Sequence, residues 1–332
     1  MAVVKTPKLF THNSVGDFLE QAQIIFSKVN RRERGFVLDF SRTKEVSILG
    51  LLLVYKVMDF TFQNRCFSDP ILINADIGEF GSAQDYYKFR HLIDALRGPK
   101  EERGKIHSML YRDPLKLAYD NMDIYFGKPN DSNRFFIAPQ VMIRDVEKTK
   151  DSLRTEYAPA VVDFYKNPEI SDMILTCITE ISLNFWLHAL EDKQSILVAE
   201  GTESKIEIAC ADTGSGILST LKSGLQRLRS APDLEIIREA VKENVSSKVN
   251  TNHLGSGLFI VDKIAQLTGG ILHIYSEGVF YQRLPGRVMV GKCGFWKGTI
   301  LYLNLPLNRS FGMNEIFQHK QVELSKIGLK FV

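Results

Sequence analysis

The fold is easiest to infer from EISLNFWLH, residues 180–188, in which a carboxylate, an amide and an imidazole recur at fixed intervals. Glu180, Asn184 and His188 are four residues apart, so on an α-helix they stack on one side, one turn apart. A helix that only packs against its neighbours has no need of these three groups beside its core face. The alternative is a polar seam that faces water, and the stretch taken alone favours that alternative.

The helix that carries these side chains is predicted to begin at Asn167 and to end near Ala189. Asparagine is a favoured N-cap, and Pro168 suits the first helical position. Apolar residues recur at helical spacing and predict its core face, made of Ile170, Ile174, Cys177, Ile181 and Phe185.

A β-hairpin is predicted over residues 195–211, with its turn at 201–204. Alternation puts three residues of the second strand on one face, namely Ile206, Ile208 and Cys210. Asp212 continues that face, so its carboxylate is directed inward and needs a hydrogen-bond donor there. Gly214 and Gly216 follow and allow backbone to approach a ligand closely. A plain turn is the alternative interpretation of this segment.

A second glycine segment, HLGSGLFIV at residues 253–261, opens a helix predicted to continue to about Leu267 and to end at Gly269. Helix N-termini present N–H groups and a favourable dipole to phosphate. The segment is not a P-loop, because no Gly-Lys-Ser/Thr follows, and it is not a Rossmann fingerprint, because no strand precedes it. Residues 298–306 predict a closing strand.

The first hundred residues alternate short apolar strands, at 35–40 and 70–75, with a helix that is apolar nearly all round, at 48–62. Residues 14–17 and 82–85 approximate capping boxes and mark two more helix starts. This alternation predicts a small sheet with helices packed on it. We therefore expect an α/β protein of two domains, with the following division: an N-terminal domain at 1–105, a connecting segment at 106–160, a second domain at 161–310 and a tail at 311–332.

Composition excludes several classes of protein. The chain has 332 residues, of which 44% are hydrophobic and 24% charged, so it can bury a core and is not mainly disordered. A net charge of +3 is too small to indicate nucleic acid or an anionic membrane as a partner. No apolar run reaches the roughly 18 residues of a membrane span, and the start lacks a signal-peptide core. These features predict a cytoplasmic location.

Four motifs, in this order and spacing, resemble those of the GHKL ATPase superfamily of gyrases, heat-shock chaperones, histidine kinases and mismatch-repair proteins. They are EISLN (180–184), DTGSG (212–216), GSGL (255–258) and GT (298–299). The resemblance covers about residues 160–310. It implies the GHKL (Bergerat) fold, an α/β sandwich with a mixed sheet and helices on one face, and it implies ATP and Mg²⁺ as ligands.

The resemblance also implies roles for individual residues. Asn184 would hold Mg²⁺ against the phosphates, and Asp212 would accept the adenine amino group, with Thr299 supporting the adenine end. Glu180 stands where hydrolytic members carry the general base, which suits a reaction that depends on positioning and charge neutralisation. The remaining motif residues would surround the nucleotide: His188, Gly214, Gly216, Gly255, Ser256, Gly257 and Leu258.

Among GHKL relatives, the Glu-Asn-His spacing of residues 180–188 is most similar to anti-sigma-factor serine kinases. The N-terminal domain resembles, more weakly, the STAS fold of anti-sigma-factor antagonists. In phosphorylated STAS members a serine stands where this chain has Leu49, and the nearest hydroxyl is Ser47. Residues 217–254 would form a lid over ATP, with a helix from Asp233 to about Val241.

Three functions follow from these resemblances. The first is an ATP-hydrolysing regulatory switch, which would act on a protein partner through the N-terminal domain. The second is a protein serine/threonine kinase of the anti-sigma type, and the third is a module that senses ATP without chemistry. The first predicts that Glu180→Ala or Glu180→Gln retains ATP but loses turnover. Labelled ATP with candidate partners tests the second, and tight binding with neither hydrolysis nor transfer would support the third. The sequence leaves open whether the chain forms a homodimer.

Overall fold

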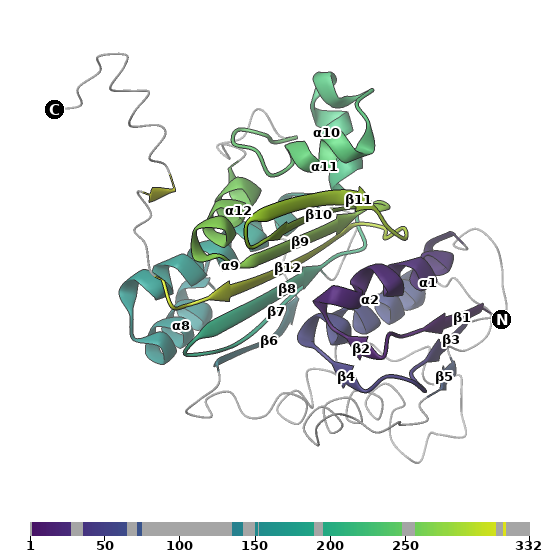
Figure 1. Cartoon of the computed structure of the whole chain (residues 1–332), viewed down its shortest axis with the longest axis horizontal. Helices are drawn as coiled ribbons and strands as arrows, with labels where there is room; N and C mark the ends of the chain where they lie inside the picture. The colour runs from purple at the N-terminus through teal and green to yellow at the C-terminus, as the bar shows by residue number, and fades with distance from the viewer. Residues whose placement is uncertain are drawn as a thin grey trace.

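The computed structural model describes residues 2–27, 36–64, 72–74, 135–141, 150–151, 153–188, 195–247, 256–309 and 315–316. These residues form a mixed α/β structure with one large sheet, one small sheet and helices on both faces of the large sheet (Figure 1). The predicted helix start at 82–85, the tail beyond residue 316 and most of the connecting segment lie outside the described residues.

The large sheet has seven strands in the order β11-β10-β9-β12-β8-β7-β6. Their bounds are β6 (Phe135–Val141), β7 (Ile196–Thr202), β8 (Lys205–Ala211), β9 (Ile271–Ser276), β10 (Val279–Leu284), β11 (Arg287–Lys292) and β12 (Thr299–Pro306). The prediction of a mixed sheet is wrong, because every neighbouring pair of these strands is antiparallel. A helical segment connects β8 to β9, and these two strands point in the same direction. They are not neighbours, because β12 lies between them and is antiparallel to both.

One face of the large sheet is covered by helices of the same C-terminal part of the chain. They include α8 (Ala158–Tyr165), α9 (Pro168–His188) and α12 (Gly257–Thr268), with the π-helical turn η3 (Leu153–Tyr157) before α8. Apolar side chains of α9 and α12 share a core with alternate residues of the central strands, among them Ile208, Cys210 and Leu301. The prediction that helices of this part cover one face is therefore confirmed.

The N-terminal part is a βαβαβ unit with a parallel sheet in the order β1-β3-β5. Its strands are β1 (Ala2–Lys5), β3 (Phe36–Asp39) and β5 (Leu72–Asn74), linked by α1 (Val15–Ser27) and α2 (Ile48–Asn64). A short parallel pair, β2 (Leu9–Phe10) and β4 (Glu45–Val46), and the turn η1 (His12–Ser14) complete it. Parallel neighbours require crossover connections, and the two helices supply them.

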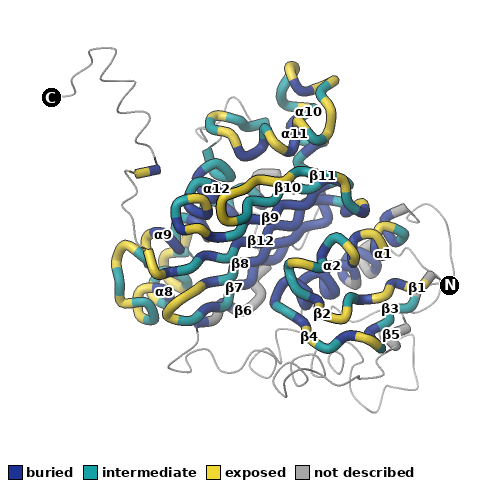
Figure 2. The backbone as a smooth tube through the Cα atoms, viewed as in Figure 1, coloured by how far each residue is buried: buried dark blue, intermediate teal, exposed yellow. Residues whose placement is uncertain are grey.

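Helix α2 lies on the face of the large sheet that α9 and α12 leave uncovered, against β7 and β8 (Figure 1). Residues of this face, such as Val198, Ala209 and Tyr302, belong to one buried cluster with the core of the N-terminal unit. The central strands are consequently dark blue, that is buried, in Figure 2. A helix that is apolar nearly all round fits this position, because α2 packs on its own small sheet and on the large one.

Local signals in the sequence located most of the C-terminal elements. Helix α9 begins at Pro168, and the Asn167 side chain accepts hydrogen bonds from the amides of Glu169 (3.0 Å) and Ile170 (3.2 Å), which confirms the N-cap.

The capping box predicted at residues 14–17 is wrong in detail: the Ser14 hydroxyl donates to the carbonyl of Leu9 at 2.6 Å and supports the turn η1. Strand β6 lies in the predicted connecting segment and adds an edge strand that no pattern indicated.

Within the described ranges, no helix combines the length and the apolar character that crossing a bilayer requires.

Candidate functional site

The first part of the candidate site lies where α9 meets the start of α12. Gly257, the first residue of α12, faces the half-buried side chains of Glu180 and Asn184. A Cβ at Gly257 would lie 2.7 Å from Asn184 Nδ2 and 2.8 Å from Glu180 Oε2. A side chain at this position would therefore displace the ends of the acid and the amide. The structure brings together one residue of the second glycine motif and two polar residues of EISLN.

The side-chain amide nitrogen of Asn184, Nδ2, is buried and has no hydrogen-bond partner among the described residues. A buried polar group without a partner costs free energy, so a ligand that supplied one would be favoured. Rotation of the amide exchanges nitrogen for oxygen at this position, so the same side chain can face a phosphate or a cation.

The second part of the site is built around Asp212, at the end of β8. Its side chain is buried, and its carboxylate accepts hydrogen bonds from the amides of Gly214 (2.7 Å) and Thr299 (3.1 Å). The Asp212 amide in turn donates to the carbonyl of Thr299 at 2.9 Å. The donors that an inward carboxylate requires are thus two backbone amides, that of Gly214 in the first glycine motif and that of Thr299 in the Gly-Thr motif. Together they fix the orientation of the Asp212 carboxylate.

Gly298 completes this second part. Its φ of +95° lies in the left-handed region, and a Cβ would lie 2.5 Å from both the carbonyl oxygen and Oδ1 of Asp212. Only glycine allows the backbone to approach the carboxylate so closely. The Gly-Thr motif therefore lies beside Asp212, as expected from the assignment of Asp212 and Thr299 to the same end of the nucleotide.

The predicted lid is partly described, as helices α10 (Ile217–Gly224) and α11 (Asp233–Glu239) with the 3₁₀ turn η4 (Gln226–Leu228) between them. Gly216 is the N-cap of α10 and lies against Glu277, which accepts a hydrogen bond from the amide of Ser219 at 2.9 Å. Helix α11 packs against β10 and β11, and its Ile236 and Ile237 are fully buried. This portion of the lid is consequently part of the packed core. Residues 248–254 of the segment lie outside the described residues.

The two parts lie on the same side of the sheet, because Asp212 follows Cys210 on the face that packs against α9. Ser256 is the N-cap of α12, and Leu258 packs beside the core that α9 shares. Gly255 and the side chain of His188 lie outside the described residues. The structure thus gathers Glu180 with Asn184 and Gly257, and separately Asp212 with Gly214, Gly298 and Thr299.

Charge near α9 also affects a neighbouring thiol. Burial raises the pKa of Cys177 far above its ordinary value, and the carboxylate of Glu180 raises that pKa further. Cys177 is therefore a protonated core residue on this helix and not a nucleophile. Among the described residues, no group of three or more acidic, histidine or cysteine side chains could enclose a metal ion.

Three residues that contact Asp212 or the segments next to it escaped prediction. The Trp296 indole donates to the Asp212 carbonyl at 2.8 Å, and the Ser276 hydroxyl donates to the Gly298 carbonyl at 2.8 Å while accepting from the amide of Ile217 at 2.9 Å. Glu277 holds the start of α10. No spacing in the sequence relates these residues to Asp212, because they reach it from a distant turn and a loop.

Two cavities lined by described residues contain none of Glu180, Asn184, Asp212 and Gly257. One is beside α1 and Phe295, and the other lies between the end of α12 and the β10–β11 turn. Arg283 borders the latter, and Asp262 accepts two hydrogen bonds from its guanidinium, at 2.6 and 2.5 Å. Arg283 therefore fastens α12 to β10 and is not available for a phosphate.

No model of a known protein family matches this chain, and no curated protein is significantly similar to it in sequence. What the protein does must therefore be inferred from the geometry of these clusters.

Proposed function

We propose that the C-terminal part of this chain is a GHKL-type domain that binds ATP with Mg²⁺ and hydrolyses it as a regulatory switch. The observation that carries the proposal is the contact of Gly257 with Glu180 and Asn184. Helix N-termini favour phosphate, and here one begins beside a carboxylate and a buried amide that lacks a partner among the described residues. Such a group suits a phosphate chain better than it suits packing alone.

The residues present fit Mg²⁺ as a ligand carried with the nucleotide. Magnesium usually keeps several waters and takes one or two protein ligands together with phosphate oxygens. Asn184 can supply one amide oxygen. The nitrogen of the same amide has no partner among the described residues, so the surroundings leave this side chain incompletely hydrogen-bonded. When bound, the ion would supply positive charge against the phosphates. The chain's own residues would bind the base at Asp212, orient the phosphates at Gly257 and hold a proton at Glu180.

Phosphotransfer to a partner is the second candidate, and two observations bear on whether the chain could instead phosphorylate its own N-terminal unit. Leu49 is fully buried in α2, and the Ser47 hydroxyl donates to the carbonyl of Phe10 at 3.1 Å and accepts from the amide of Gly50 at 3.3 Å. Ser47 is thus engaged in capping α2. These contacts favour hydrolysis over transfer to the N-terminal unit, which we propose instead to contact a protein partner in the cytoplasm.

The test compares Glu180→Gln with wild type in ATP binding and in phosphate release. The variant should bind Mg-ATP within about threefold of wild type and lose roughly 10²-fold or more in turnover, because an amide cannot accept the proton of water. Glu169→Gln, an exposed change in the first turn of the same helix, should leave both unchanged.

Three outcomes would count against parts of this proposal. Absence of ATP binding by the wild-type protein would refute it entirely. Unchanged turnover in Glu180→Gln would exclude Glu180 as the base. Label from γ-labelled ATP on an added protein, with little phosphate release, would replace hydrolysis by phosphotransfer.

A further inference from the structure

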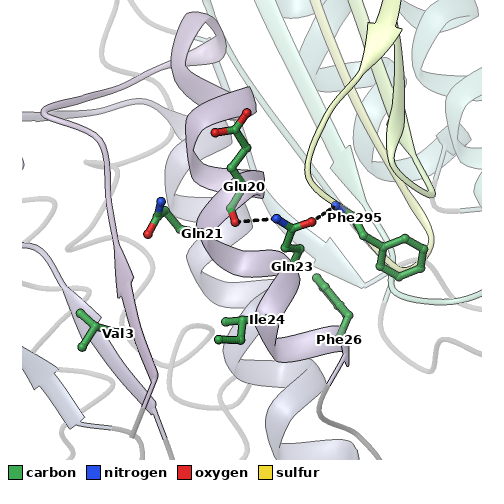
Figure 3. Close-up of a pocket in the computed structure, with 7 residues that line it drawn as sticks. All are labelled: Val3, Glu20, Gln21, Gln23, Ile24, Phe26 and Phe295. Atoms are coloured by element: carbon green, nitrogen blue, oxygen red, sulfur yellow. Dashed lines mark hydrogen bonds between the residues drawn. The ribbon is translucent and has the colours of Figure 1, made fainter.

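The loop at residues 293–298 lies between α1 of the N-terminal unit and the Asp212 cluster. On its outer side, Gly294 approaches the backbone of Leu19 and Glu20 so closely that no Cβ could be placed there without moving one of the two segments. The Phe295 amide donates to Oε1 of Gln23 at 3.3 Å, and Figure 3 shows this side chain reaching from α1 to the loop. Helix α1 therefore holds the loop through both its backbone and a side chain.

On its inner side the same loop fixes Asp212. Trp296 is fully buried, and its indole donates to the Asp212 carbonyl at 2.8 Å. Its carbonyl accepts from the amide of Glu277 at 3.1 Å, so the loop is also tied to the turn that holds α10. Three residues further on, the Thr299 amide donates to the Asp212 carboxylate at 3.1 Å. Any displacement of the loop must move donors to both the backbone and the side chain of Asp212.

Aromatic packing joins the two sides. The Phe26 ring, near the end of α1, meets Trp296 edge-on with ring centroids 5.1 Å apart, and meets Phe295 at 6.1 Å. The region is open on one side, where α1, Val3 and Phe295 line a cavity of about 690 Å³, and Phe295 is 41% exposed. The contact between α1 and the loop is therefore partly open to solvent.

We propose that the loop 293–298 couples α1 to nucleotide binding, with Trp296 as the positioning residue through which α1 sets the orientation of Asp212. The inference rests on the proposed function, because it assigns regulation to the same site. In this scheme a movement of α1, such as a partner of the N-terminal unit would cause, alters ATP affinity without contact between that partner and ATP. The coupling is reciprocal, so ATP binding also tightens the hold of the loop on α1.

The experiment uses Gly294→Ala in the full-length chain. The added methyl must separate the loop from α1, because the atoms it meets are backbone. ATP affinity should fall by about 5- to 20-fold, within the usual range of coupling between sites. Gly16→Ala is the matched control, since it is the same change in α1 with nothing within 4 Å, and it should leave affinity unchanged. Gln23→Ala, an exposed substitution, should weaken binding in the same direction by about two- to threefold.

Two further measurements separate positioning from general destabilisation. Amide hydrogen exchange at Gly214 and Thr299 should accelerate in Gly294→Ala while exchange in β8 and α9 stays as in wild type. In a Trp186→Phe background, which leaves Trp296 as the single tryptophan of the chain, ATP should change the emission of the wild-type loop more than that of the Gly294→Ala loop.

The outcomes distinguish this inference from the proposed function. If wild type binds ATP and Gly294→Ala binds it equally well, the coupling is refuted and the function stands. If wild type binds no ATP, the proposed function is refuted. Amide hydrogen exchange alone then tests whether α1 and Asp212 are linked through the loop. Unchanged exchange at Thr299 in Gly294→Ala would refute that link as well.

Discussion

Substituting Gly257 by alanine separates a functional from a purely structural role for the start of α12. Gly257 has no positive φ that would exclude alanine, and alanine is the better helix former by about 0.8–1 kcal/mol. If the segment served packing alone, Gly257→Ala should therefore be neutral or slightly stabilising. The functional interpretation makes a different prediction, because the atoms beside this position are the site residues themselves.

The size of the effect follows from the contacts. The methyl would lie 2.7 Å from Asn184 Nδ2 and 2.8 Å from Glu180 Oε2, against about 3.4 Å for an ordinary contact, so both groups must retreat by roughly 0.6–0.7 Å. Side-chain ends can make this movement at little cost, so the melting temperature should change by no more than about 3 °C. Magnesium tolerates little change in its 2.0–2.1 Å ligand distances, and a 1 Å misplacement of reacting groups can cost about 10²-fold. ATP turnover should accordingly fall by about 10- to 100-fold.

The assay is steady-state phosphate release beside thermal unfolding for wild type, Gly257→Ala and Gly16→Ala. Gly16 has open space around its Cβ position, so its substitution should stabilise α1 by about 0.4–1 kcal/mol and leave turnover intact. Wild-type turnover in a folded Gly257→Ala protein would refute the assignment of Glu180 and Asn184 to the site.

Two predictions concern the fold. Burial lowers the pKa of His273 from 6.5 to about 3, with the charge of His12 as a further cause, so the unfolded chain binds a proton first as the pH falls below about 6.5. Stability should decline from there toward pH 3, by roughly 2 kcal/mol at pH 4.5, and urea midpoints against pH should be flatter for His273→Leu than for wild type. Gly269 ends α12 with a φ of +69°, so Gly269→Ala should lower the free energy of unfolding by about 1 kcal/mol although its Cβ would meet nothing. A Gly269→Asn variant should lose less, because asparagine tolerates this conformation, and an equal loss would contradict the explanation.

The parts of the fold that sequence predicted correctly are those with strong local signals. Helix α9 has an asparagine cap at Asn167, the hairpin β7–β8 has two short strands of β-forming residues around a short turn, and α12 stops at a glycine in the left-handed region. Each of these features is determined by residues within a few positions of one another, so a single sequence suffices to find it.

The features that escaped prediction depend on distant residues. Strand β6 pairs with β7 across more than fifty residues, and β12 enters between β8 and β9 only in the folded sheet. The bond from the Trp296 indole to the Asp212 carbonyl spans 84 positions. Neither periodicity nor a cap marks such contacts, which is why the motif residues Gly214 and Thr299 were predicted beside Asp212 but the bond from Trp296 was not.

The central claim is that one Mg-ATP molecule binds beside Asp212, and the most direct test is thermal unfolding with and without Mg-ATP for wild type and Asp212→Asn. A ligand at about one hundred times its Kd should stabilise the folded protein by about 2.7 kcal/mol, which corresponds to a rise of about 5 °C for a chain of this size. The account predicts that rise in wild type and little or none in Asp212→Asn, each compared with its own ligand-free melting temperature. No rise in wild type at millimolar Mg-ATP, or an equal rise in both proteins, would contradict it.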